Sequence, residues 1–278
     1  MRLILTLTLL TATVAAAQWI RYPTPGIPRT RDGKPNLSAP APRSGGKPDL
    51  SGVWQTEGTT REENERLLPG IGALSAPGDD PATFSKYFFN LLADFGPEQN
   101  PMRPEAAELF RERMAHPEKA GERIPCLPLG IPSAELISAP YKIIQTPGLI
   151  LVLYEAVDNK FRQIYTDGRK HTPDPQPTWL GYSTGKWEGD TLIVTSLGFN
   201  DLDGIDGLGH PRSEATRITE RFRRRDFGRM DLEITIDDPK NYTRPFTVKA
   251  ISRLVPDSDI LESVCAENEK DLVHLKGK

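Results

Sequence analysis

The chain has 278 residues, with 35 Lys and Arg against 38 Asp and Glu, and its formal net charge is −3. The hydrophobic share of 37% is enough to build a core and excludes a wholly disordered chain. The near-neutral charge argues against a nucleic-acid-binding protein, which needs a basic surface to meet phosphates. No apolar run after the N-terminus approaches the roughly 20 residues of a membrane-spanning helix, so we predict no membrane span in the mature chain.

Residues 1–17 have the pattern of a secretion signal. A basic residue and an apolar stretch precede Ala15 and Ala17, which form the small-x-small pattern that signal peptidase cleaves. We therefore predict a mature chain that begins at Gln18 and a periplasmic or secreted protein.

Export changes what the two cysteines mean. In an oxidising compartment, Cys126 and Cys265 are expected to form a disulfide, and two buried free thiols are the alternative. A redox pair is disfavoured because the sequence has no CxxC spacing.

The mature chain divides into an arm and one domain. Residues 18–50 are rich in Pro, Gly and Ser without a sustained period, which predicts an extended arm or a flexible tether. Residues 51–278 are predicted to form a single β-barrel domain with a helical insertion at about 60–120. Apolar residues at helical spacing predict helices over 82–95 and 104–114 in that insertion.

The second half of the chain has the composition of β-structure, with runs rich in Val, Ile, Thr and Phe between turn signals. The predicted strands are 51–56, 141–146, 149–156, 161–167, 178–187, 191–198, 215–225, 230–237, 246–255 and 260–267. Because successive strands joined by short turns tend to be neighbours, we predict a mainly β fold. It is an antiparallel up-and-down meander barrel with an N-terminal arm and two or three packed helices.

Three hairpins follow from the alternation of polar and apolar residues. The sharpest sets Arg223 opposite Asp231, which makes one face a ladder of opposite charges and the other face mostly apolar. The other two hairpins, each again opposing charges, pair Glu155 with Arg162 and Arg253 with Glu262.

An antiparallel meander also predicts where the connections lie. The tight turns, which fall at one end, are 158–159, 188–190, 226–229 and 256–259. The long polar connections, which fall at the other end, are 168–177, 199–214 and 238–245. A scaffold with its long loops at one end is typical of a loop-built site, although long loops also accumulate there simply because they tolerate insertion.

Two segments resemble known proteins. Gly52-Val53-Trp54 resembles the Gly-x-Trp opening strand of lipocalins and related calycin barrels, and the meander behind it fits that likeness. The stretches 165–169 and 186–191 are similar to a group of secreted bacterial proteins without assigned activity. The resemblance implies a barrel able to hold an apolar ligand. The sequence departs from the lipocalin pattern in two ways. Roughly eighty residues separate Gly52 from the next strand, and we assign no position to the usual basic closing residue.

Three residues are the candidates for acid/base chemistry. Glu220 is predicted to point inward from an apolar face, where burial would raise its pKa, or where an inward Arg such as Arg224 would pair with it. His171 and His210 fall among the long loops and could act as general bases beside neighbouring carboxylates, or be ordinary surface residues.

Aromatic and polar residues near the same end could contact a ligand, although large aromatic residues on strands are more often core. The ligand-binding candidates are Trp179, Tyr182, Trp187, Asn200, Arg212 and Tyr242. The acidic loop 201–207 departs from the helix-loop-helix calcium pattern because Ile205 occupies a ligand position, so we predict no metal and no cofactor. A metal held by the Asp residues of this loop with His210 and Glu214 is the alternative.

Three functions remain open at this point. The first is an exported binding protein that holds a small, partly apolar ligand in a barrel open at one end. The second is an enzyme, an isomerase, lyase or hydrolase, that uses Glu220 with His171 or His210. The third is a structural envelope protein whose arm and helices dock a partner.

Overall fold

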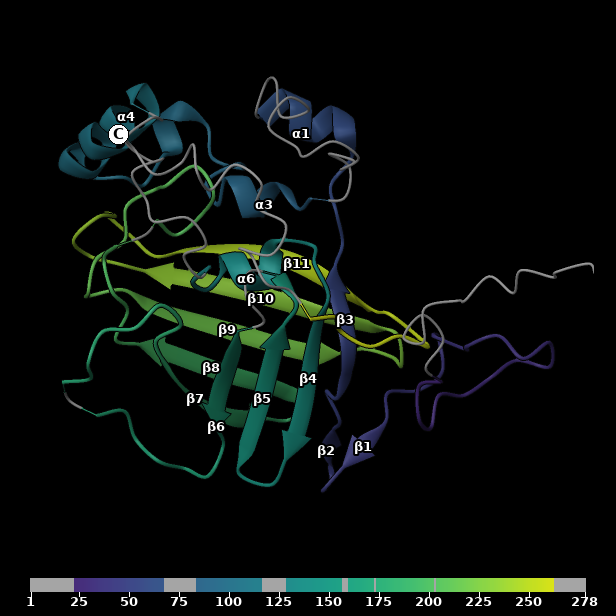
Figure 1. Ribbon diagram of the computed structural model, residues 1–278. Helices are drawn as coiled ribbons and strands as arrows, with labels where there is room; N and C mark the ends of the chain where they lie inside the picture. Colours follow the sequence, from purple (N-terminus) through teal and green to yellow (C-terminus); the bar gives the residue numbers. More distant parts are fainter. Residues whose placement is uncertain are drawn as a thin grey trace, which may run out of the picture.

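The computed structural model describes residues 23–67, 84–116, 129–156, 160–172, 174–202 and 204–262. The predicted signal peptide and both cysteines lie outside these residues. A closed nine-stranded barrel forms the body of the described part, with helices gathered over one end and the N-terminal segment beside the other (Figure 1). No helix of the described residues is long and apolar enough to cross a membrane.

The barrel strands follow one another around the ring in chain order. They are β3 (Gly52–Thr56), β4 (Tyr141–Thr146), β5 (Leu149–Tyr154), β6 (Phe161–Tyr165), β7 (Tyr182–Glu188), β8 (Thr191–Leu197), β9 (Arg217–Arg224), β10 (Arg229–Asp237) and β11 (Phe246–Leu254). β11 then pairs with β3 and closes the ring. The prediction of a mainly β barrel is confirmed.

The barrel is not wholly antiparallel, because an odd number of strands cannot alternate in direction around a closed ring. One pair has to be parallel, and that pair is β6 and β7. The connection 166–181 carries the chain back along the outer wall to start β7 at the end where β6 starts. The predicted all-antiparallel order is therefore wrong at this one position.

The β9–β10 hairpin has the predicted register. Arg223 lies opposite Asp231, and inward Glu220 lies opposite Ile234. Apart from inward Glu220 and Arg224, apolar residues face inward and polar residues outward along both strands, so a one-residue slip would turn the outward charges inward, which fixes the pairing.

The predicted β5–β6 register is wrong. Arg162 lies opposite Val152 rather than Glu155, and Leu153 lies opposite Phe161. β5 reads Leu-Ile-Leu-Val-Leu-Tyr, which is apolar on both faces, so its pattern does not specify which face turns inward.

The predicted last hairpin is also wrong. Residues 260–262 have no strand structure, and the edge of β11 that they were expected to occupy is taken by β3, with Arg253 opposite Gln55. Closing the ring therefore replaces the expected local partner with a strand from the start of the domain.

One of the two predicted helices is shorter than predicted, and the other has its predicted length. The predicted helix over 82–95 is reduced, in its described part, to α3 (Lys86–Phe89) followed by a turn. α4 (Pro104–Ala115) has its predicted length, but it buries Ala106, while Met114 on the predicted face is exposed. The remaining elements are α1 (Arg61–Leu67), the 3-10 turn η2 (Pro97–Gln99), α6 (Ser133–Leu136) and the small hairpin β1 (Arg43–Ser44) with β2 (Lys47–Pro48).

Different segments close the two ends of the barrel. At the end where β3 finishes, all four residues of α6 are buried, and Thr56 donates a hydrogen bond to the Glu135 carbonyl. This helix plugs the end that we expected to be open. At the other end, the arm lies on the tight turns, where the Phe227 amide donates to the Ala39 carbonyl.

The core fills the barrel between these closures. Its largest fully buried side chains include Trp54, Tyr141, Ile150 and Ile164. The long connections 199–214 and 238–245 lie at one end, as predicted. This is the α6 end, over which the helices also lie (Figure 1). The β5–β6 connection also begins and ends there, contrary to the prediction, because the parallel pair shifts the order of the ends.

Candidate functional site: a cleft between two strands

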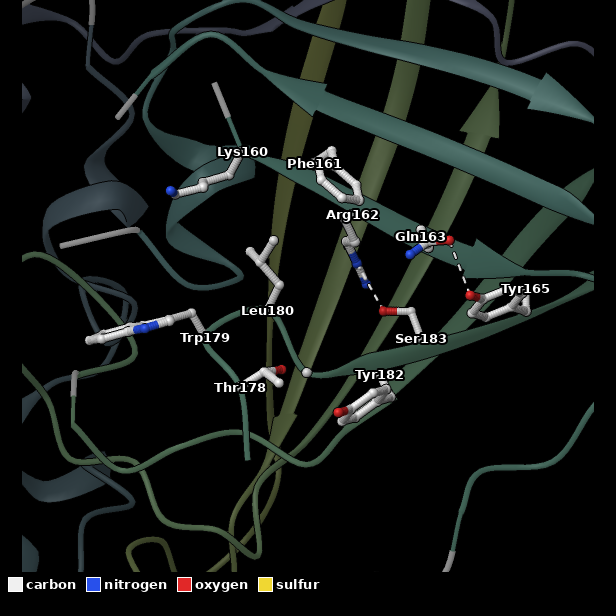
Figure 2. Close-up of a pocket in the computed structure, with 11 residues that line it drawn as sticks. Lys160, Phe161, Arg162, Gln163, Tyr165, Thr178, Trp179, Leu180, Tyr182 and Ser183 are labelled. Carbon is white, nitrogen blue, oxygen red and sulfur yellow. Dashed lines mark hydrogen bonds between the residues drawn. The ribbon is translucent and has the colours of Figure 1, made fainter. Parts of the chain in front are cut away.

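The weakest point of the barrel wall is the parallel pair. β6 and β7 pair only through Ile164 with Ser183 and Tyr165 with Thr184, whereas β9 and β10 pair along eight residues. Before these two pairs, the strands diverge around a cavity of about 400 Å³. The chain segments that line it, shown in Figure 2, are residues 160–163, Tyr165 and residues 178–183.

Strand alternation gives the cleft two kinds of lining. Outward-facing Phe161 and Tyr182 are 58% and 40% exposed, which is unusual for side chains of this size. Inward-facing Arg162 and Ser183 are buried and are joined by a hydrogen bond of 2.9 Å from the Arg162 Nε (Figure 2). The cleft thus has aromatic lips and a polar floor that belongs to the barrel interior.

Two residues extend the cleft toward a second hollow. Thr178 and Trp179 line both the cleft and a cavity of about 680 Å³ that also contacts Asn200 and Asp201. The Thr178 hydroxyl oxygen is buried and has no hydrogen-bond partner in the described structure. A buried hydroxyl without a partner costs free energy unless something outside the chain satisfies it.

Behind the cleft floor, three charged side chains meet inside the barrel. The Arg162 guanidinium donates to both oxygens of Glu220, at 3.0 Å for Oε1, and to Glu135 Oε1 at 2.8 Å. All three side chains are at most 1% exposed. Glu135 also accepts a hydrogen bond from Tyr154, while its second oxygen, Oε2, has no partner in the described structure.

This environment changes the proton affinity of Glu135. The pKa of its carboxyl is raised to about 7, because burial and the nearby charge of Glu220 raise it more than the positive charge of Arg162 lowers it. Burial also raises the pKa of the Tyr154 phenol well above its usual value, so this tyrosine remains a neutral donor. Glu135 is therefore the buried carboxyl of the barrel that can change its charge near neutral pH.

The three predicted acid/base residues do not come together. Glu220 points inward as predicted, but its partner is Arg162 rather than Arg224. His171 lies on the outer wall, where its Nε2 is 3.0 Å from the carbonyl oxygens of Tyr182 and Thr195. None of the contacts of the described residues joins a histidine to Glu220.

His210 sits in a separate enclosed dyad. Its Nδ1 is 2.6 Å from Asp206 Oδ2, and its ring stacks on Phe110 with centroids 4.0 Å apart. Asp206 also accepts a hydrogen bond from the backbone amide of Leu91, which ties the turn after α3 to this loop. The adjacent carboxylate that we expected beside this histidine is present, and it holds three elements together.

Of the six predicted ligand-binding residues, four line a hollow of the structure and two are buried. Trp179 and Tyr182 line the cleft, and Asn200 lines the second hollow. Trp187 lines a smaller hollow elsewhere on the barrel. The other two are buried and bonded within the protein: Arg212 donates to the Asn200 carbonyl, and Tyr242 donates to the Pro211 carbonyl at 2.8 Å.

Sequence reasoning missed Arg162 and Glu135. The predicted pairing with Glu155 made Arg162 one half of an ordinary surface ion pair. The alternation with Ile164 along β6 carried the signal that it faces inward. Glu135 lies in a short buried helix between the two predicted regions, and we find no pattern around it that predicts its place.

No protein-family model, no curated protein and no solved structure matches the chain. Among the described residues, no group of three or more His, Cys, Asp or Glu side chains is arranged to hold a metal ion. The fold and the site together define a closed nine-stranded barrel with an aromatic cleft in its wall.

Proposed function

We propose that this chain is a small-molecule-binding protein whose site is the cleft between β6 and β7. The observation that carries the proposal is that exposed Phe161 and Tyr182 line the same cleft as Thr178, whose buried hydroxyl has no partner in the described structure. Apolar walls with a few polar groups are typical of ligand sites, and about 400 Å³ lies within the usual range of about 300–1,000 Å³. The ligand is small and partly apolar, and it enters through the wall rather than the barrel's end.

A calycin-like relationship belongs to the same proposal. The guanidinium carbon of Arg224 lies 4.8 Å from the centre of the Trp54 ring in the Gly-x-Trp segment. This contact supports Arg224 as the basic closing residue that the resemblance implies. The nine strands and the parallel pair distinguish this barrel from the eight-stranded lipocalin arrangement.

Export completes the proposal. A signal peptide cleaved before Gln18 would deliver the binding domain to the periplasm or beyond, where Cys126 and Cys265 would form a disulfide. The intact mass of protein recovered from the native compartment tests both points, because cleavage and oxidation each change the mass by a known amount.

An acid/base enzyme has less support. The expected partnership of Glu220 with His171 or His210 has no contact behind it, and Glu220 instead accepts hydrogen bonds from Arg162. The carboxyl suited to proton transfer near neutral pH is Glu135, and it lies under the cleft floor rather than on its surface.

The cleft is tested with the fluorescent probe 8-anilinonaphthalene-1-sulfonate, whose aryl rings match aromatic walls. We expect Phe161→Ala to weaken binding about tenfold, because it removes one lip of the cleft. Leu109→Ala is the matched control, since Leu109 is an exposed apolar residue of α4, 40% exposed and outside the cleft. Equal binding by both variants would contradict the assignment of the site.

A further inference from the structure

The charged side chains that line the cleft are all basic. Of the described residues, Lys160 and Arg162 line it, and no Asp or Glu does. The Lys160 ammonium forms no ion pair with a described residue. The Lys160 ammonium beside aromatic walls favours a ligand with an apolar body and a negative group.

Arg162 cannot supply a hydrogen bond to that group. A guanidinium has five N–H donors, and here the partners account for all of them: Ser183, Ser196, Glu135 and two bonds to Glu220. Arg162 therefore acts on a ligand through the charge of its cluster, and Lys160 remains as the group that can pair with an anion directly.

The charge of the cluster depends on one proton. With Glu135 and Glu220 both ionised around Arg162, the cluster carries a charge of −1, and with Glu135 protonated it is neutral. A negative cluster beneath the floor repels an anion in the cleft, and the repulsion is strong because the cluster is shielded from water. Removing it requires a proton on Glu135.

Glu135 can accept this proton without losing a contact. Its Oε1 atom accepts the bonds from Tyr154 and Arg162, while Oε2 has no partner in the described structure. The titratable groups that face it are Tyr154 on β5, Tyr141 on β4, Arg162 on β6 and Glu220 on β9. Burial raises the pKa of both tyrosines and sets that of Glu135 at about 7.

We propose that the cleft takes small organic anions with an aromatic or apolar body, and that Glu135 takes up a proton when such an anion binds. The inference rests on the proposed function, since it concerns the same cleft. By reciprocity, a ligand that favours protonated Glu135 binds more tightly when that proton is already present. The affinity for an anion therefore falls as the pH rises through neutrality.

The test compares two probes that share one aryl body. 8-Anilinonaphthalene-1-sulfonate carries a sulfonate, and N-phenyl-1-naphthylamine is its neutral counterpart. Between pH 6 and pH 8.5, we expect the affinity of the sulfonate to fall by at least about fivefold, while that of the neutral probe stays constant. Calorimetry of the sulfonate near pH 7, in two buffers of different protonation enthalpy, should show proton uptake by the unaltered protein.

Three variants assign the effect. Glu135→Gln should bind the sulfonate at every pH as tightly as the unaltered protein does at pH 6. Lys160→Met should weaken binding of the sulfonate and leave the neutral probe unaffected. His171→Gln should keep the full pH dependence, which separates Glu135 from the histidine that contacts the Tyr182 carbonyl.

Results other than these contradict either this inference alone or the proposed function as well. A constant affinity for the sulfonate in the unaltered protein, no proton uptake, or a pH dependence that persists in Glu135→Gln or disappears in His171→Gln overturns this inference. The proposed function survives those results if Phe161→Ala still weakens both probes. If neither probe binds, or if neither depends on Phe161, both the inference and the proposed site fail.

Discussion

Arg162 holds two carboxylates in the barrel interior, an arrangement that is expensive to bury. Its desolvation is offset only because every N–H group has an acceptor, including Ser183 and Ser196. A set of apolar side chains of the same volume would stabilise such an interior equally well or better. The cluster is thus better explained by its position under the cleft than by its contribution to folding.

Replacing Glu135 should remove a pH dependence of stability. The pKa of its carboxyl is about 7 in the folded chain against 4.5 for an exposed glutamate, so the folded state binds the proton more tightly. The stabilisation is complete below pH 4.5 and is lost as the pH rises to about 7, with a total of about 3 kcal/mol. Glu135→Gln should therefore equal the unaltered protein at pH 4.5 and exceed it at pH 8.

Urea unfolding at both pH values measures this difference. Glu62→Gln on the exposed face of α1 is the control and should leave the free energy of unfolding unchanged at each pH. If Glu135→Gln is instead less stable at pH 8, the ionised carboxylate gains more from Arg162 than it loses by burial.

At the scale of elements, the parallel pair is the consequence of closing nine strands. β6 and β7 share two residue pairs, whereas β10 shares eight with each of its neighbours. Fewer ladder hydrogen bonds mean that this seam opens at a lower free energy than the β9–β10–β11 sheet. A ligand that enters through the wall needs such an opening, so the weak pairing and the cleft belong together.

Hydrogen exchange should reveal this difference between elements. We expect amides of residues 161–165 and 182–185 to exchange faster than those of 217–237, because the seam opens locally while the β9–β10–β11 sheet opens only on global unfolding. Mass spectrometry of peptides after exchange gives the comparison, with β4–β5 as an internal reference of six residue pairs. Equal protection across the seam and the sheet would mean that the wall opens only as a whole.

How far the sequence predicts this structure differs from element to element. The β9–β10 hairpin was predictable because most of its charged residues alternate with Ile and Phe. Only one register keeps these charges on the solvent side. The sequence of β5 does not specify a register in this way, since Leu151 and Leu153 on its outer face are as apolar as the residues on its inner face. Of the Arg162 cluster, only the inward position of Glu220 was predicted. Its partners were not, because the cluster forms only in the folded barrel, across up to 85 positions of sequence between Glu135 and Glu220.

At the scale of the whole molecule, both ends of the barrel are occupied by segments from outside the meander. α6 enters one end, and the arm covers the other through backbone contacts such as that of Gly228 with Leu37. In the proposed function, a small molecule therefore enters through the wall. The same closure explains why Arg224 matters, since this residue of β9 joins the arm to β3 and to the β9–β10 turn at once.

Removing Arg224 should loosen the arm and destabilise the whole barrel. Its guanidinium donates to the carbonyls of Asp49 at 2.6 Å, Ser51 at 3.2 Å and Phe227 at 2.5 Å, and it packs on Trp54. Arg224→Leu leaves these buried carbonyls without donors, which should lower the free energy of unfolding by about 3 kcal/mol.

The matched control is Arg223→Leu, the neighbouring residue of the same strand, which is exposed on the opposite face. Because the arm contains several Arg and Lys residues, limited digestion with trypsin reports its release directly: Arg224→Leu should be cut within residues 23–50 well before Arg223→Leu. If the two variants unfold at the same urea concentration and are cut at the same rate, the arm is held by its apolar contacts, such as Leu37 and Leu50, and the closing role of Arg224 is refuted.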